Sequence, residues 1–295
     1  MVDFETELEM VARRVDAFLS DVLPQPVGPE SRLLEAMRYA SLGGGKRLRP
    51  FMVMQSGHIF GMDQEVMLRI AASVECVHTY SLVHDDLPSM DDDDMRHGKP
   101  STHVEFNEAT AILTGDALLT FAFEMLSDPS AHPDPFVRCE LISRLAATIG
   151  FHGMVGGQMI DMIAEEKELE ITAITRMQRM KTGNLIAYAC ESGAVAARAS
   201  HAATHALNAY AQDLGIAFQI TDDILDIEGE AAKMGKSTGK DENAGKATFV
   251  SILGMERAKA QARLLASQAM AHLDLFDEKA DLLREVANFA VERKH

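Results

Sequence analysis

Six carboxylates lie within ten residues, directly after an apolar segment. The run DDLPSMDDDD covers residues 85–94 and follows SVECVHTYSLVH. No Lys or Arg stands three or four positions before Asp85 or Asp86, where it could pair with them along a helix. Pro88 should end the helix, so we expect the chain to turn back and bring Asp91 toward the first two aspartates. Clustered carboxylates of this kind suit Mg²⁺, a hard cation that keeps water or phosphate oxygens as further ligands.

An EF-hand calcium loop and a plain surface loop are the alternatives to a magnesium site at this cluster. The EF-hand is excluded, because the twelfth position counted from Asp91 is Thr102 and not Glu. A solvated acidic surface loop remains open from the residues alone.

A second acidic group, FQITDDILD, covers residues 218–226. Asp222 and Asp226 share one face of a predicted helix, with Asp223 beside them. Their positions three and four residues away hold no base, and their neighbours are apolar. Carboxylates that repel one another at the edge of a core destabilise the fold unless a cation compensates. Two such clusters in one chain favour a polymetal site that binds a diphosphate.

Cations beside glycines would serve such a site. The segment GGGKRLRP, residues 43–50, places bases at a predicted helix start, where backbone N–H groups suit an anion. It lacks the spacing of a P-loop. His78 lies seven residues before Asp85, on nearly the same helical face, although a lone helical histidine is more often a core residue. Further candidates stand beside glycines or acidic residues: Arg96, His97, Lys181, Lys236, Lys240 and Lys246.

Helical periodicity dominates the elements that must position these residues. Met67, Ile70, Val74 and Val77 recur at steps of three and four, as do apolar residues in the segment 204–227. Strand signals are nearly absent, and no hairpin dipeptide separates alternating runs. Pro and Gly clusters fall between the helical segments, and none is long enough for an interdomain linker. We predict one all-α domain over residues 1–295, built from roughly ten or more helices.

Composition limits the partners and the compartment. The chain of 295 residues carries a formal charge of −17, which argues against general binding of nucleic acid or of an anionic membrane. It would also repel a diphosphate unless local cations reverse the field. The three cysteines are scattered, as expected of reduced thiols in a cytoplasmic protein, and the acidic start is unlike a signal peptide. No charge-free apolar stretch is long enough to span a bilayer.

The motifs together resemble the trans-prenyltransferase (polyprenyl diphosphate synthase) family, most closely its bacterial farnesyl diphosphate synthases. The matching segments run in order from residue 43 to 246: GGGKRLRP, ECVHTYSLVHDDLPSMDDDDMRHGKPSTH, LTGDALL, GGQMIDM, KTGNLI, FQITDDILD and GKSTGKDENAGK. The resemblance implies the isoprenoid-synthase fold, a single helical bundle around a central cavity, in a homodimer. It also implies a prenyltransferase that joins isopentenyl diphosphate to dimethylallyl and geranyl diphosphate, giving (2E,6E)-farnesyl diphosphate.

The resemblance further implies roles for single residues. A set of Mg²⁺ ions, three by the family pattern and replaceable by Mn²⁺, would bind Asp85, Asp86, Asp91, Asp222, Asp223 and Asp226. The allylic diphosphate would contact Arg96, Lys181 and Lys236, with Lys246 as a further substrate contact. Isopentenyl diphosphate would contact Gly45, Lys46, Arg49, His78 and His97. Thr182 and Gln219 would present oxygens to the developing cation, Gln158 and Asp161 match the family's GQxxD helix, and residues 293–295 resemble its closing tail.

Two positions bear on specificity. Most family members have a second arginine where this chain has His97, so the strength and pH dependence of that contact are open. Tyr80, five residues before Asp85, matches the aromatic position that in this family accompanies a fifteen-carbon product, with Ser81 beside it. A residue that merely packs between helices is the alternative for Tyr80.

Three other classes of protein share part of this pattern. A geranylgeranyl diphosphate synthase would share every motif and differ in product length. A class I terpene cyclase normally lacks the second DDxxD motif and has little use for an isopentenyl site. A non-catalytic regulatory subunit typically loses one aspartate motif, whereas both are intact here.

Overall fold

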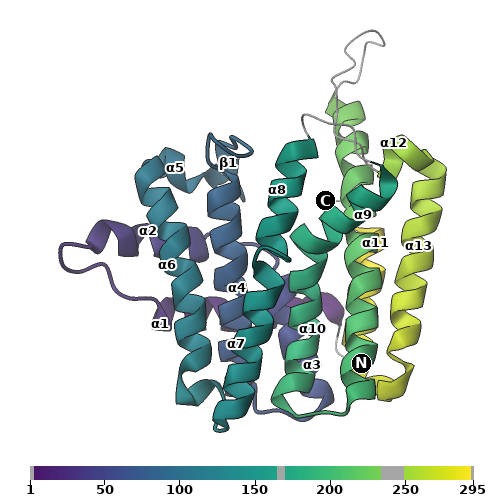
Figure 1. Ribbon diagram of the computed structural model, residues 1–295, viewed down its shortest axis with the longest axis horizontal. Helices are drawn as coiled ribbons and strands as arrows, with labels where there is room; N and C mark the ends of the chain where they lie inside the picture. Colours follow the sequence, from purple (N-terminus) through teal and green to yellow (C-terminus); the bar gives the residue numbers. More distant parts are fainter. Residues whose placement is uncertain (1–2, 165–169, 234–248, 294–295) are drawn as a thin grey trace. The chain divides into compact units, whose positions relative to one another are not determined.

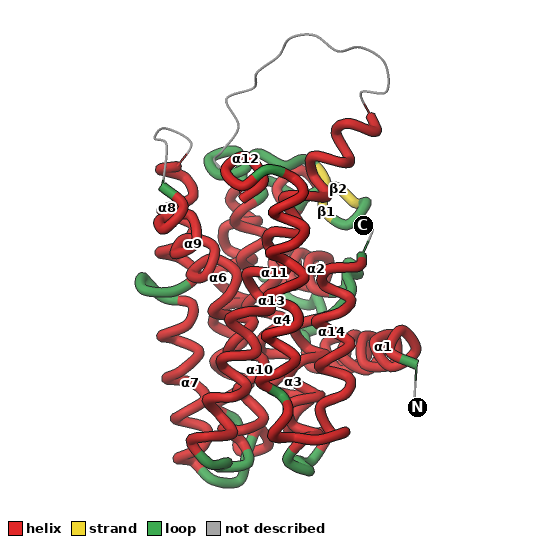
Figure 2. The backbone as a smooth tube through the Cα atoms, turned by 90° about the vertical axis from the view of Figure 1, so that its right-hand side faces the viewer, coloured by secondary structure: helices red, strands yellow, loops and turns green. Residues whose placement is uncertain are grey.

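The computed structural model of this chain describes residues 3–164, 170–233 and 249–293. Figure 2 shows that these residues lie almost entirely in helices, with one short pair of strands. The all-α prediction is therefore confirmed. The chain divides into two compact units, Met1–Ile142 with Ser192–Arg198, and Ser143–Glu191 with Ala199–His295. The single domain over residues 1–295 stays a prediction.

The first unit is built around one buried helix. Its helices are α1 (Phe4–Val22), α2 (Ser31–Ser41), α3 (Leu48–Ile59), α4 (Gln64–Asp85), α5 (Thr102–Glu105) and α6 (Glu108–Ser127), with a short 3-10 turn at Pro129–Ala131. Helix α4 packs against α3 and α6, beside which it runs in Figure 1. The stripe predicted from Met67 to Val77 is at most 1% exposed, and all residues of the range 70–77 are buried, so this part of α4 is enclosed on every side. Each such side chain stabilises the fold by about 1.5–3 kcal/mol.

Local signals set where these helices begin and end. The Asp63 carboxylate accepts the N–H groups of Glu65 and Val66 and so caps α4. Asn107 caps α6 in the same way through the N–H of Thr110. Gly61, just after α3, has φ 66°, a conformation that glycine adopts without steric cost.

The second unit is organised by the long helix α11 (His201–Lys233). Its other elements are α8 (Met154–Ala164), α9 (Ile171–Gln178), a π-helical turn (Arg179–Gly183), α12 (Phe249–Leu253), α13 (Met255–His272), a 3-10 segment (Asp274–Ala280) and α14 (Asp281–Glu292). Helices α7 (Pro135–Ile149) and α10 (Asn184–Ala196) each contribute residues to both units. Helix α11 packs against α13 and α14, and the buried Tyr210 hydroxyl donates to the carbonyl of Leu283 at 2.6 Å.

A two-residue hairpin departs from the sequence-based expectation. Strands β1 (Met95–Arg96) and β2 (Lys99–Pro100) pair antiparallel across His97 and Gly98. Both turn residues have positive φ, 51° and 76°, as a tight hairpin requires. Sequence patterns could not predict this hairpin, because strands of two residues carry no alternation and histidine is a rare residue at such a turn.

Two of the described helices, α4 and α6, match a membrane span by length and composition. In their most apolar windows, 72% of α4 and 44% of α6 is buried. Core helices pass the same test, so this match alone is weak evidence of a membrane span. On α6, two large apolar side chains, Ile112 and Leu113, are exposed.

Candidate functional site

The first aspartate cluster turns back on itself as the sequence predicted. Helix α4 ends at Asp85, and the N–H of Asp91 donates to the carbonyl of Asp85 at 2.8 Å. Pro88 lies between them in a turn closed by backbone bonds to Leu87. The loop therefore holds the backbone of Asp91 against that of the first aspartate.

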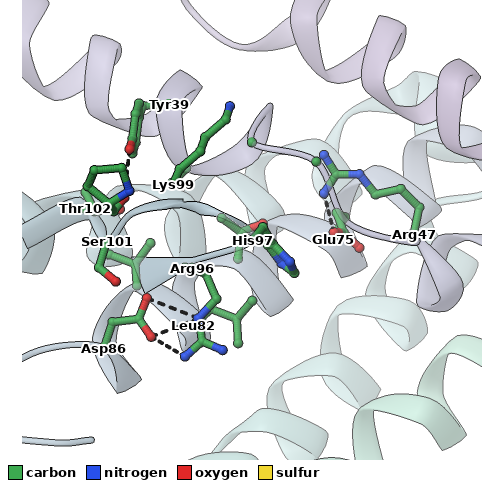
Figure 3. A pocket seen from close by; sticks show the side chains of 16 residues that line it. Tyr39, Arg47, Glu75, Leu82, Asp86, Arg96, His97, Lys99, Ser101 and Thr102 are labelled. Atoms are coloured by element: carbon green, nitrogen blue, oxygen red, sulfur yellow. Dashed lines mark hydrogen bonds and ion pairs between the residues drawn. The ribbon is translucent and has the colours of Figure 1, made fainter. Parts of the chain in front are cut away.

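Asp86 is buried and joined to Arg96 from the hairpin. The Arg96 Nε donates to both carboxylate oxygens of Asp86, at 3.0 and 3.3 Å, and Nη2 also contacts Asp86 (Figure 3). The same Nη2 contacts the Asp93 carboxylate. The hydrogen bond with Asp86 raises the pKa of Arg96, so the guanidinium stays charged. Spacing along the predicted helix could not find this partner, because the hairpin brings it from ten residues further on.

The residues assigned to isopentenyl diphosphate include a pair across α3 and α4. Arg49 Nη1 lies 3.3 Å from His78 Nε2. Burial, followed by the positive charge of Arg49, lowers the pKa of His78 well below its usual value. His78 is thus neutral, and its Nε2 accepts from Arg49, which assigns the other proton to Nδ1.

The glycine-rich turn and the hairpin approach each other beside this pair. Gly45 has φ 110°, and a Cβ added there would lie 3.6 Å from His97 Nε2. Lys46 is exposed at the same turn. The structure therefore brings together, within the first unit, the residues that the family resemblance assigned to one ligand.

A pocket lies between α2, α4 and the hairpin in this unit, with about 490 Å³ of empty space that includes open solvent. Figure 3 shows its charged side chains, and they include Arg47 and Glu75, neither of which the sequence reasoning assigned to the site. Arg47 has φ 51° and ψ 36°, a left-handed conformation that costs a bulky residue roughly 1–2 kcal/mol. Its αL backbone and buried guanidinium are features that a sequence does not display.

Tyr80 lies one turn deeper along α4 than Asp85. It is 5% exposed, its hydroxyl has no hydrogen-bond partner among the described residues, and its ring meets His84 edge-on at 5.8 Å. Burial, followed by the charge of Asp85, raises the pKa of Tyr80 to about 12. The Ser81 hydroxyl donates to the carbonyl of His78, 2.9 Å away.

In the second unit, a π-helical turn presents the catalytic candidates Lys181 and Thr182. Lys181 Nζ donates to the Asp161 carboxylate of α8 at 2.7 Å. Helix α8 can approach this turn closely because residue 157 is glycine. A Cβ at Gly157 would lie 2.3 Å from the backbone nitrogen of Lys181. Turns of this kind occur mainly at functional sites.

Side-chain amides complete this part of the site. Gln158 is 8% exposed, and neither polar atom of its side chain has a hydrogen-bond partner among the described residues. A buried amide left this way is destabilising unless a ligand or water satisfies it. Thr182 and Gln219 are both half-buried.

The second aspartate cluster lies on α11 and meets a base from the end of the described chain. Arg293 Nη2 donates to Asp222 Oδ1 at 2.6 Å, and its guanidinium carbon lies 3.6 Å from the centre of the Phe218 ring. Burial first, then the charges of Asp222 and Asp226, raises the pKa of Asp223 to about 6. The repulsion predicted for this cluster is therefore present. The prediction that no base lies nearby holds for residues three and four positions away on the helix, but Arg293 supplies a base from elsewhere in the chain.

Some candidates lie outside the described residues. These are Lys236, Lys240, Lys246, Lys294 and His295. The roles that the resemblance gives them stay predictions.

The carboxylates fit Mg²⁺ only if other ligands complete its shell. Among the residues that the structure describes, no group of three or more acidic, His or Cys side chains could hold an ion unaided. Mg²⁺ is commonly bound through one or two carboxylates, with waters and substrate phosphate as the rest. The raised pKa of Asp223 means that its charged form is destabilised, and a bound cation would stabilise that form.

Comparisons with known proteins identify the family of this chain. The family model for polyprenyl synthetase matches residues 30–286. The chain is 42% identical to the farnesyl diphosphate synthase of Escherichia coli (strain K12) over 300 residues, covering 99% of each. It is 39% identical to the geranylgeranyl diphosphate synthase of Cyanophora paradoxa, covering 92% of this chain and 90% of that one.

A solved structure agrees over nearly the whole length. The apo structure of an FPP/GFPP synthase from Zymomonas mobilis is 46% identical, has a TM-score of 0.90, and covers 98% of this chain and 99% of its own. The resemblance drawn from the motifs is thereby confirmed. This chain belongs to the polyprenyl synthetase family.

Proposed function

We propose that this protein is a Mg²⁺-dependent farnesyl diphosphate synthase. It joins isopentenyl diphosphate head to tail with dimethylallyl diphosphate and then with geranyl diphosphate. The observation that carries the proposal is the pair of aspartate clusters, one in each unit, each with its own nearby bases. The full-length similarity to a synthase of that name supports the fifteen-carbon product.

The cation would be held by the same six aspartates that the resemblance assigns: Asp85, Asp86, Asp91, Asp222, Asp223 and Asp226. When bound, it would supply Lewis-acid stabilisation of the leaving diphosphate. Its binding would also relieve the repulsion that raises the pKa of Asp223. Three ions, and replacement by Mn²⁺, are the finer parts of this proposal.

The chain's own residues orient the substrates and stabilise charge. Asp161 holds the Lys181 ammonium, and Asp86 holds the Arg96 guanidinium, so both cations are preorganised for a diphosphate. Arg49, paired with His78, would bind the isopentenyl diphosphate. The amide oxygen of Gln219 and the hydroxyl of Thr182 would face the developing allylic cation. The apolar wall of α4 excludes water that would otherwise capture that cation.

Geranylgeranyl diphosphate synthesis is the second candidate. The similarity to the Cyanophora paradoxa enzyme favours it. The buried Tyr80, one turn beyond Asp85, favours the shorter product. Both aspartate clusters are intact, and this argues against a regulatory subunit.

We further propose a cytoplasmic homodimer without stable membrane association. The three cysteines of the chain are all free, as in a reducing compartment. The exposed apolar side chains of Ile112 and Leu113 on α6 support association of two copies.

A product assay tests the proposed reaction. The purified protein is incubated with isopentenyl and dimethylallyl diphosphate, with Mg²⁺ or with EDTA, and the alcohols released by phosphatase are identified. We expect farnesol, and only with Mg²⁺. Geranylgeraniol as the main alcohol would contradict the product, and no alcohol at all would contradict the enzyme assignment.

A further inference from the structure

Two side-chain pairs join α3 to α4 in parallel. Arg47 and Arg49 stand two residues apart at the start of α3, and each meets a residue of α4. Their partners, Glu75 and His78, are three residues apart and so share one face of that helix. Only Arg49 and His78 are assigned to the substrate by the motifs.

The Arg47 guanidinium donates to acceptors on three separate elements. Its Nη1 donates to Glu75 Oε1 at 2.5 Å, its Nε to Asp16 Oδ1 at 2.8 Å, and its Nη2 to the carbonyl of Ser41 at 2.6 Å. These bonds tie α1, the end of α2 and the middle of α4 to the residue that begins α3.

Burial makes this arrangement specific. The side chains of Arg47 and Glu75 are 3% and 6% exposed, whereas that of Asp16 is 44% exposed. A planar guanidinium that meets acceptors on three elements fixes their separation and register. The glycine-rich turn spans residues 43–45, between the Ser41 carbonyl and Arg47, so both of its ends are held by one side chain.

We propose that Arg47 and Glu75 are positioning residues for isopentenyl diphosphate. The buried pair sets the register of α3 on α4, and that register places Arg49 on His78 and Lys46 at the mouth of the turn. Arg47 itself does not touch the substrate. This inference rests on the proposed function, since it assumes that Arg49 and His78 bind isopentenyl diphosphate.

A double variant separates positioning from simple stabilisation. Replacing one partner alone leaves a buried charge unpaired, but replacing both with apolar residues often preserves stability. In Arg47→Met/Glu75→Leu we expect a Tm within a few degrees of wild type. We expect the KM for isopentenyl diphosphate to rise about tenfold or more, since small misplacements of binding groups have large effects. The KM for geranyl diphosphate should stay within about twofold.

Two further variants calibrate this result. Arg47→Lys keeps the charge but cannot meet three acceptors at once, so its KM for isopentenyl diphosphate should be intermediate even if the double variant does not fold. Arg38→Met is the matched control, because Arg38 ties α2 to the carbonyls of Ser20 and Leu23 without reaching the site. It should lower the Tm and leave both KM values near wild type.

Each outcome either supports or overturns the positioning role. An unchanged KM for isopentenyl diphosphate in folded Arg47→Lys or in the double variant overturns the proposal. An equal rise in both KM values, or the same rise in Arg38→Met, also overturns it, because the effect would then be general. Calorimetric binding of isopentenyl diphosphate alone separates this inference from the reaction. If the wild type binds it but makes no farnesyl product, the proposed function fails while the variants still test positioning; if the wild type does not bind it, both fail.

Discussion

Charged side chains at both aspartate clusters are matched by bases that come from elsewhere in the chain. Asp86 meets Arg96 and Asp222 meets Arg293, and neither base stands at helical spacing from its partner. The acidic motifs therefore do not present bare carboxylates. Each cluster combines ligands for a cation with a guanidinium that suits phosphate.

Removing one of these carboxylates tests the metal role. In Asp85→Asn or Asp222→Asn we expect kcat to fall by about 10²-fold or more, the scale of losing a key electrostatic contact. The KM values should change less, because the phosphate-binding bases remain. Steady-state kinetics at saturating Mg²⁺ measures this, with the exposed Asp274→Asn as the control. Near-normal turnover in either variant would contradict the proposal that several metal ions bind at these aspartates.

His97 makes the pH dependence of substrate binding informative. Loss of solvent, followed by the charges of Arg96 and Arg47, lowers its pKa from 6.5. A lowered pKa leaves the imidazole neutral at pH 7 and protonated only in more acidic solution. Loss of the imidazolium charge, and the rise in KM for isopentenyl diphosphate that should accompany it, is therefore expected below pH 6.5.

The comparison with His97→Arg isolates this effect. Substrate phosphates also titrate near pH 6, and the arginine variant reports that titration alone. We expect the KM of the wild type to rise between about pH 5 and 6.5 relative to the variant, and to be flat above pH 7. Superimposable profiles would place His97 outside the binding site.

At the scale of elements, α4 carries the proposed metal ligand Asp85 and the proposed chain-length residue Tyr80. Tyr80 lies five residues before Asp85, about 7–8 Å down the helix axis, and is buried. A growing chain that follows α4 from Asp85 would meet this ring. Tyr80→Ala should extend the product to twenty carbons with near-normal turnover, as read from the alcohols after phosphatase treatment.

A matched substitution keeps this test specific. Tyr80→Phe keeps the ring and removes the hydroxyl, which has no partner among the described side chains, so the product should stay at fifteen carbons. If Tyr80→Ala still stops at fifteen carbons with normal activity, another residue forms the floor.

The π-helical turn lies directly against Gly157 of α8. A Cβ on Gly157 would lie 2.3 Å from the backbone nitrogen of Lys181 and 2.7 Å from its Cα. Backbone atoms cannot move aside as the end of a flexible side chain can. Gly157→Ala should therefore displace Lys181 and lower kcat by about 10²-fold, with a reduced Tm. Gly183→Ala in the same turn is the contrast, because its nearest atom would lie at an ordinary 3.7 Å. Equal activity in the two variants would contradict the steric argument.

At the scale of the whole molecule, periodicity and motif order predicted the helical class and the family. The helix α4 was predictable because its large apolar residues recur at steps of three and four, although residues 70–77 are buried on every side. The Arg96–Asp86, Arg293–Asp222 and Arg47–Glu75 pairs were not, because each joins residues from separate elements and depends on tertiary geometry. The hairpin at His97 was not predictable for a different reason, because its strands are too short to show an alternating pattern.

Association of two copies through α6 would cover two exposed apolar side chains. Ile112 and Leu113 are 45% and 55% exposed on this helix, and a buried interface between copies would remove them from water. Light scattering should give twice the chain mass of 32.3 kDa. Each copy carries −17, so screening by salt should strengthen rather than weaken the pair. Ile112→Glu/Leu113→Glu should yield monomers, whereas the control Leu275→Glu, at another exposed apolar site, should not. A wild-type mass of one chain at micromolar concentration, or a dimer that persists in the double variant, would show that this face is not the interface.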